Sequence, residues 1–241
     1  MIFKRISMLR IQDFQFNPFQ TNCYVVWDDS KECAIIDPAP LPGRETDILA
    51  DFVAAQGLTP KAILLTHGHG DHALGVAECL RHWDVPVYMN SADRDICRQH
   101  AKMCAQMGMG QLDSEFPATD VKEEDKIAFG GHEFIVIETP GHTPGGVSYL
   151  CIEEKVLFSG DTLFRGTIGR TDLPGGDFDE ILKSLNGKLL GLAGDIEVFP
   201  GHGPSTSIAE EVQSNPFLQP FNEEVDMDEA AANAIAPTFK R

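Results

Sequence analysis

Four short apolar runs of this chain are each followed, directly or after a short turn, by histidine or aspartate. They are followed by the segment His67–His72, by His142, by Asp161 and by His202. Apolar runs of this length, bounded by Gly, Pro or Asp, are typical of short strands. Polar side chains that follow strands gather at the sheet rim where open α/β architectures collect their functional groups. The pattern therefore predicts a fold that brings seven ligand-type side chains to one sheet edge.

The apolar pattern predicts many short strands and a smaller number of helices. Strands are expected near residues 8–16, 22–27, 33–36, 62–66, 85–89, 133–138, 146–152, 155–159 and 196–199. Helices are expected over residues 44–56, 72–82, 92–107, 177–190 and 205–213. The segments 24–37 and 149–161 both read strand, charged turn, strand, aspartate. This echo favours two similar halves, with the irregular stretch 108–120 between them.

The balance of charges excludes several classes of partner. The chain contains 37 Asp and Glu residues against 19 Lys and Arg, and its formal net charge is −18. Proteins that bind nucleic acid or anionic membranes need a basic face, so we expect neither as a partner. A small-molecule substrate fits the composition better, and the oligomeric state stays open.

Length and cysteine usage favour one reduced, cytoplasmic domain. We expect a single catalytic domain over residues 1–221 and an acidic tail over residues 222–241. The six cysteines form no CxxC pair, and the N-terminus lacks the pattern of a signal peptide. No apolar run reaches the roughly 18 residues that a membrane span requires.

The segment 67–72, HGHGDH, is the strongest indication of chemistry, because it carries three histidines and an aspartate within six residues. Neutral imidazole and carboxylate are ligands for Zn, Fe and Mn. In a tight turn, the first two histidines can project to one side and the Asp-His pair to another, which suits two metal ions better than one. His142 and His202 alone would be ordinary loop residues, and Asp161 a turn cap, but the cluster favours a metal-binding interpretation of all three.

The other three histidines have no ligand-like neighbours in the sequence. His82 lies at the end of the helix expected over 72–82, where an imidazole complements the helix dipole. His100 lies within the polar helix 92–107, and His132 follows a Gly-Gly turn. All three are therefore expected on the surface, outside the site.

The motifs THGHGDH, TPGHTPGG, SGDTLF and FPGHGPST resemble those of the metallo-β-lactamase superfamily over residues 8–215. They are most similar to its glyoxalase II branch, the hydroxyacylglutathione hydrolases. The short bacterial members of that branch also carry a segment like GRTDLPGGD, here residues 169–177. The resemblance implies an α+β fold, the αβ/βα sandwich, in which two mixed sheets pack face to face with helices outside and metals at one edge.

The resemblance also implies two divalent metal ions, which we expect to be Zn with Fe or Mn as alternatives. By position, the ligands of the first ion are His67, His69 and His142, those of the second are Asp71, His72 and His202, and Asp161 bridges both. A hydroxide generated by the two ions attacks an acyl carbonyl. Asp71 also orients this nucleophile or shuttles its proton, so the catalytic carboxylates are Asp71 and Asp161.

The implied reaction is hydrolysis of a thioester such as lactoylglutathione. Full-length glyoxalase II enzymes hold much of the glutathione in a C-terminal helical domain, whereas only 39 residues follow His202 here. Arg165 and Arg170 are the candidates that replace that domain. For Arg170, a structural ion pair with Asp172 is an equally strong alternative.

Four other functions are compatible with motifs of this kind. A mono-iron persulfide dioxygenase is similar around GRTD, and metal content separates it from the hydrolase. A nuclease is disfavoured by the net charge of −18 and the lack of a basic patch. A lactamase is possible, but lactamases usually have a different set of ligands at the second metal site. A non-catalytic binding domain predicts missing ligands, and none is missing.

Overall fold

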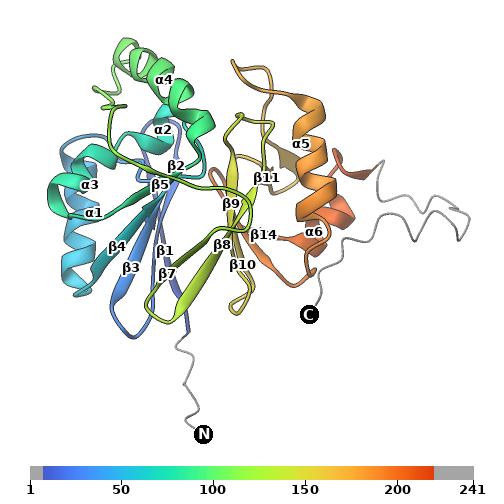
Figure 1. Cartoon of the computed structure of the whole chain (residues 1–241), viewed down its shortest axis with the longest axis horizontal. Coiled ribbons are helices and arrows are strands. Elements are labelled where there is room, and N and C mark those ends of the chain that lie inside the picture. The colour runs from blue at the N-terminus through green and yellow to red at the C-terminus, as the bar shows by residue number, and fades with distance from the viewer. Residues whose placement is uncertain (1–7, 220–241) are drawn as a thin grey trace, which may run out of the picture.

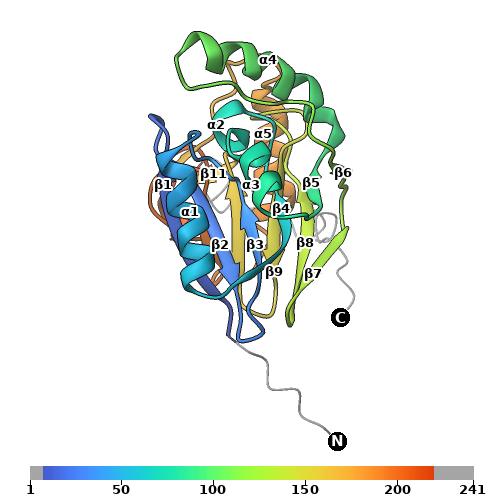
Figure 2. The ribbon, with the colours of Figure 1, turned by 90° about the vertical axis from the view of Figure 1, so that its left-hand side faces the viewer.

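Two six-stranded sheets pack face to face between two layers of helices in the computed structural model, which describes residues 8–219 (Figure 1). This is the αβ/βα sandwich of two mixed sheets that the resemblance implied. Figure 2 shows that α1 (Arg44–Ala55) and α3 (Val76–His82) lie over the outer face of the first sheet, and that α4 (Arg94–Gln106) lies across the end of its strands. Two further helices, α5 (Phe178–Ser184) and α6 (Ile208–Ser214), lie on the outer side of the second sheet.

The first sheet combines an antiparallel meander with parallel strands. Its order is β1 (Arg10–Phe16), β2 (Thr21–Trp27), β3 (Glu32–Ile36), β4 (Thr59–Leu64), β5 (Val87–Met89) and β6 (Thr119–Asp120). From β3 to β6 the neighbours are parallel, and parallel neighbours need crossover connections. These contain α1 (Arg44–Ala55), α2 (Gly70–Ala73), α3 (Val76–His82), the 3-10 turn Ser91–Asp93 and α4 (Arg94–Gln106).

The second sheet is antiparallel apart from one pair of strands. Its order is β14 (Thr206–Ser207), β13 (Glu197–Pro200), β10 (Val156–Gly160), β9 (Val147–Cys151), β8 (His132–Glu138) and β7 (Lys126–Phe129), and β10 and β13 are the parallel pair. The crossover between them holds the ribbon β11 (Leu163–Phe164) and β12 (Thr167–Ile168), then α5 (Phe178–Ser184) and the π-helical turn Leu185–Leu189. The last described helix is α6 (Ile208–Ser214).

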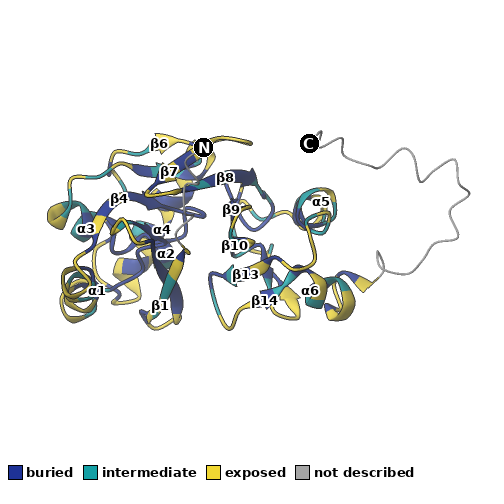
Figure 3. Cartoon of the chain, turned by 90° about the horizontal axis from the view of Figure 1, so that it is seen from below, coloured by how far each residue is buried: buried dark blue, intermediate teal, exposed yellow. Residues whose placement is uncertain are grey.

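Side chains that alternate along a strand pack in different layers of the molecule. Successive residues of a strand face opposite sides of its sheet. In β2, Cys23 and Val25 pack with Leu49 of α1, whereas Tyr24 and Val26 pack against the second sheet. All seven residues of β2 are therefore buried, and the strands lie in the buried middle of the molecule in Figure 3. A third cluster joins the second sheet to α5 and α6.

All nine expected strands are present, and the structure corrects some boundaries. The helix expected over 72–82 is two helices, α2 and α3, with Gly75 just before the second. A Cβ at Gly75 would stand 2.7 Å from the Pro40 ring, so only glycine fits at this position. Five short strands were not predicted (β6, β7, β11, β12 and β14), because two to four residues give little periodicity.

Some predictions concern residues that the structure does not describe. The acidic tail predicted over 222–241 lies outside the described residues, and the domain boundary at residue 221 stays a prediction. Between residues 8 and 219, no helix combines the length and the apolar character needed to cross a membrane.

Candidate metal centre

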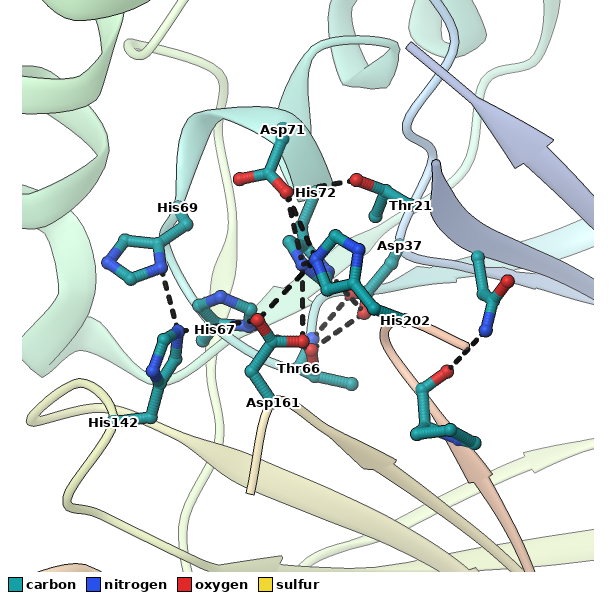
Figure 4. Close-up of polar contacts among 12 residues, drawn as sticks. Thr21, Asp37, Thr66, His67, His69, Asp71, His72, His142, Asp161 and His202 are labelled. Carbon is teal, nitrogen blue, oxygen red and sulfur yellow. Dashed lines mark hydrogen bonds and ion pairs between the residues drawn. The ribbon is translucent and has the colours of Figure 1, made fainter. Parts of the chain in front are cut away.

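All seven predicted ligand side chains lie together at the edge where β4, β8, β10 and β13 end (Figure 4). Their ligand atoms form three groups, each within 4.8 Å: His67, His69 and His142; His67, His72 and Asp161; and Asp71, His72 and His202. Asp161 reaches both ends of the cluster, because its Oδ2 lies 3.4 Å from His142 Nε2 and 3.5 Å from His202 Nε2.

Three histidines of the cluster have their Nδ1 protons engaged by fixed acceptors. His142 Nδ1 lies 2.7 Å from the Arg170 carbonyl, His202 Nδ1 lies 3.1 Å from the Phe19 carbonyl, and His72 Nδ1 lies 2.9 Å from Asp37 Oδ2. A carbonyl or carboxylate oxygen only accepts, so each Nδ1 carries the proton. In the neutral rings, each Nε2 then presents a lone pair to the cluster, as metal-binding histidines do.

His67 also carries its proton on Nδ1, because of its hydrogen bond with Thr66. The Thr66 hydroxyl donates to Asp37 Oδ2 at 2.7 Å, so at 3.1 Å it accepts from His67 Nδ1. His67 Nε2 and Asp161 Oδ1 are buried and have no hydrogen-bond partner among the described residues. A buried polar atom without a partner is costly. These unpartnered acceptors on the inner side of the cluster fit metal ions, which would complete their coordination.

His69 has the opposite orientation from the other four histidines. Its Nδ1 faces inward, 2.9 Å from His142 Nε2, while its buried Nε2 has no partner in the described part of the chain. The stacked ring of His100, with centroids 4.2 Å apart, covers one side of it.

The charges of the cluster are complementary. Burial raises the pKa of Asp71, but His72, His202 and the Thr21 hydroxyl outweigh this effect and hold the pKa below its usual value. Asp161 is likewise buried, and the same two histidines lower its pKa. Both carboxylates are therefore ionised at neutral pH.

Several histidines of the cluster have shifted pKa values, and the shifts go in opposite directions. Burial, assisted by the neighbouring histidines, lowers the pKa of His67 and brings that of His69 to about 2. Burial also lowers the pKa of His72, but Asp71 and Asp161, with Asp37 behind the ring, raise it well above its usual value. In the metal-free protein, His72 therefore carries a proton that a metal ion must displace.

The glycines of the segment 67–72 let this loop lie against α4. A Cβ at Gly68 would stand 2.6 Å from the Asp93 backbone oxygen, and one at Gly70 would stand 2.4 Å from Cys104 Sγ. The loop approaches α4 this closely only because both positions lack a side chain.

Asp93 joins two of the ligand loops, a role that no sequence pattern indicated. Its fully buried carboxylate accepts from the Gly68 N–H at 2.7 Å, the Gly145 N–H at 2.6 Å and the Thr143 hydroxyl at 2.7 Å. Burial raises the pKa of Asp93. The side chain positions the loops that carry His67 and His142 without itself facing the cluster.

A cavity of about 680 Å³ opens beside the cluster. Its apolar walls come from Phe19, Met103, Met107, Phe164, Ile168 and Leu173. Arg170 lies on its wall, and the guanidinium donates two hydrogen bonds to Asp172, at 2.7 and 2.8 Å, so the alternative structural pair is present. Arg165 does not line this cavity and instead donates to Glu210 at 2.9 Å. Of the two predicted arginines, only Arg170 therefore lies on the cavity wall.

Two of the three histidines expected on the surface are buried, which corrects the sequence prediction. His82 is exposed, as expected. His100 is only 8% exposed and lines the cavity. His132 lies 3.7 Å from both Asp28 and Glu154. The helix of His100 packs on the loop 67–72, and a linear pattern cannot show such a contact.

Comparison with known proteins is consistent with this geometry. The model of the metallo-beta-lactamase superfamily matches residues 16–202. The chain is 37% identical over 212 residues to hydroxyacylglutathione hydrolase GloC of Haemophilus influenzae, covering 87% of this chain and 98% of that protein.

Two solved structures are similar over nearly their whole length. BLEG-1, described as a B3 metallo-beta-lactamase, has a TM-score of 0.79 at 38% identity and covers 87% of this chain and 99% of its own. TTHA1623, solved in a di-iron-bound form, has a TM-score of 0.77 at 37% identity and covers 86% and 100%.

Proposed function

This chain belongs to the metallo-beta-lactamase superfamily and is a metal-dependent hydrolase, and we propose that its substrate is a thioester, specifically a hydroxyacylglutathione such as lactoylglutathione. The observation that carries the metal-dependent activity is the proton arrangement of the cluster, and the similarity to GloC supports the thioester substrate. Four histidines form a hydrogen bond through Nδ1 on the outer side of the cluster and leave Nε2 for a ligand: His67, His72, His142 and His202. A degenerate site would have no reason to keep this arrangement.

We assign two divalent ions to the cluster, zinc first, with iron or manganese as alternatives. His67, His69 and His142 would hold the first ion, and Asp71, His72 and His202 would hold the second. Asp161 lies within reach of both groups and would be shared by the two ions. When bound, such ions lower the pKa of a shared water and polarise the acyl carbonyl. The similarity to a protein solved with two irons supports a dinuclear centre.

Asp71 is the group that we propose for proton transfer. It lines the cavity, and its Oδ2 accepts from the Thr21 hydroxyl at 2.9 Å, which fixes the carboxylate beside the cluster. In the reaction, a C–O bond forms as the C–S bond breaks. Asp71 then holds the proton lost by water and passes it to the departing thiolate, so that the products are an acid and a thiol.

The glutathione carrier is supported by the similarity to GloC and by Arg170 on the cavity wall. Because the protein carries a net charge of −18, an anionic thioester depends on such local cations for binding. We place the protein in the cytoplasm, which fits its six free, buried cysteines.

The test combines elemental analysis of the purified full chain with an assay of S-lactoylglutathione hydrolysis. We expect two metal ions per chain, hydrolysis, loss of hydrolysis on chelation, and recovery on adding Zn, Fe or Mn. Two metals without thioester hydrolysis would overturn the substrate while leaving the site. One iron per chain, with oxygen consumed on glutathione persulfide, would replace the hydrolase by a persulfide dioxygenase.

A further inference from the structure

His100 is a buried histidine beside the metal centre that belongs to none of the three ligand groups. It comes from α4, and its ring stacks on His69 with an angle of 17° between the planes. Its Nδ1 lies 3.1 Å from the backbone nitrogen of Gly70. The ring is thus held both by the stack and by a hydrogen bond to the ligand loop.

The hydrogen bond from Gly70 fixes the tautomer of His100. A backbone N–H only donates, so His100 Nδ1 must present its lone pair. The neutral ring then carries its single proton on Nε2, at the other end of the ring. Nε2 makes no hydrogen bond to any residue between 8 and 219, so this N–H donor is available to a ligand in the cavity that His100 lines.

No other cavity-lining residue of α4 or of its C-terminal end offers this donor a strong acceptor. The other cavity-lining residues of α4 and its C-terminal end are Met103 and Met107, whose thioethers are at best weak acceptors. A ligand that fills this side of the cavity without offering an oxygen therefore leaves the N–H unpaired, which costs binding energy. A site with such a donor discriminates against analogues that lack the matching acceptor.

We propose that His100 Nε2–H donates a hydrogen bond to the 2-hydroxyl oxygen of the acyl group and so selects 2-hydroxyacyl thioesters over simple acyl thioesters. This inference rests on the proposed thioester hydrolysis. The acyl carbonyl is attacked at the cluster, and His100 lies one ring away from it, beside the ligand His69. A substituent on the carbon next to the carbonyl is the part of the substrate that such a neighbour meets.

Two substitutions distinguish the role of the Nε2–H donor in the cavity from that of the hydrogen bond between Gly70 and Nδ1. In His100→Asn, the side-chain oxygen takes the place of Nδ1 and keeps the bond from Gly70, but the donor at Nε2 is lost. In His100→Gln, the amide reaches the position of Nε2 and keeps a donor there, but the acceptor for Gly70 is lost. His82→Asn, at an exposed histidine of α3, is the matched control.

The experiment measures kcat/KM for lactoylglutathione and propionylglutathione, which differ only in the 2-hydroxyl, together with metal content and Tm. We expect the wild type and His82→Asn to prefer lactoyl by about tenfold or more. His100→Asn is expected to lose most of this preference through a higher KM for lactoylglutathione at unchanged metal content. His100→Gln is expected to keep the preference and to lower Tm.

Each other outcome has a defined meaning. An unchanged preference in His100→Asn, or loss of it only in His100→Gln, would show that His100 is structural and would overturn the inference. A wild type that hydrolyses both thioesters without preference overturns the inference but leaves the proposed function, and this result needs no variant to fold. A metal-loaded wild type that hydrolyses neither overturns both.

Discussion

Asp37 and Asp161 end two equivalent hairpins, yet they have different places in the metal centre. Asp37 follows the β2–β3 hairpin of the first sheet, and Asp161 follows the β9–β10 hairpin of the second. Asp37 accepts from the Thr66 N–H at 2.7 Å and from His72 Nδ1, behind the cluster. Asp161 instead faces the inner nitrogens of three histidines, and its Oδ1 has no hydrogen-bond partner among residues 8–219.

The difference between the two carboxylates comes from their neighbours and not from their local sequence. Asp37 lies beside β4, the parallel neighbour of β3, and Thr66 beyond the end of β4 supplies both a backbone and a hydroxyl donor. Its lone pairs are used within the protein, so it can only orient other groups. Asp161 keeps lone pairs that the protein leaves unused, so it can bind metal.

The largest effect is expected from Asp161→Asn. The amide keeps the shape but loses the charge and one acceptor, so the two metal sites lose their shared ligand. We expect kcat to fall by more than about 100-fold, beyond the range typical of residues that only orient ligands. Elemental analysis should show less than the wild-type metal content. Wild-type activity and metal content would remove Asp161 from the metal site.

Asp37→Asn tests the orienting role. Asn tolerates the positive φ of 48° at this position, so the backbone should be preserved. Its NH₂ group cannot accept from His72 Nδ1, which favours the tautomer with the proton on Nε2 and blocks coordination. We expect metal affinity to fall by about 10- to 100-fold. A chelator competition measures this, and an affinity equal to the wild type would contradict the role.

The pH dependence of metal affinity sharpens the same contrast. The pKa of His72 is raised, so the metal-free protein holds a proton that metal must displace. Affinity should therefore rise with pH, by about tenfold per unit while one proton is displaced, and level off above the raised pKa. Asp37 contributes to this raised pKa, so Asp37→Asn should level off at a lower pH. Competition titrations across neutral pH check both, and a flat wild-type profile would exclude a protonated His72.

Thr66→Val should have the smallest effect, because it removes only the hydroxyl between Asp37 and His67. We expect a loss of about 1 kcal/mol in the free energy of unfolding and a less than tenfold loss of activity. Thr66→Ser keeps the hydroxyl and serves as the control. Thermal unfolding and kcat/KM measure the two effects, and a Val variant as active and stable as Ser would remove Thr66 from the network.

Much of the site was predictable because each predicted ligand follows an apolar run, and strand ends in this fold share one rim. The groups behind the ligands were harder to find. Asp37 had a signal, since it ends the segment that echoes 149–161. Asp93 had none, because its three donors come from loops distant in sequence. His100 was misassigned to the surface, because the packing of α4 on the loop 67–72 is a tertiary contact.

By itself, the sequence determined the strand pattern and the rim of ligand-type residues. These are local or compositional properties, and they depend on which residues follow which. Only the tertiary structure decided the proton on each imidazole, the different places of Asp37 and Asp161, and the donor that His100 offers to the cavity. The physical reason is that hydrogen bonds to buried groups are directional and come from segments far apart in the chain. Which lone pair stays free for a ligand is therefore settled only when those segments pack.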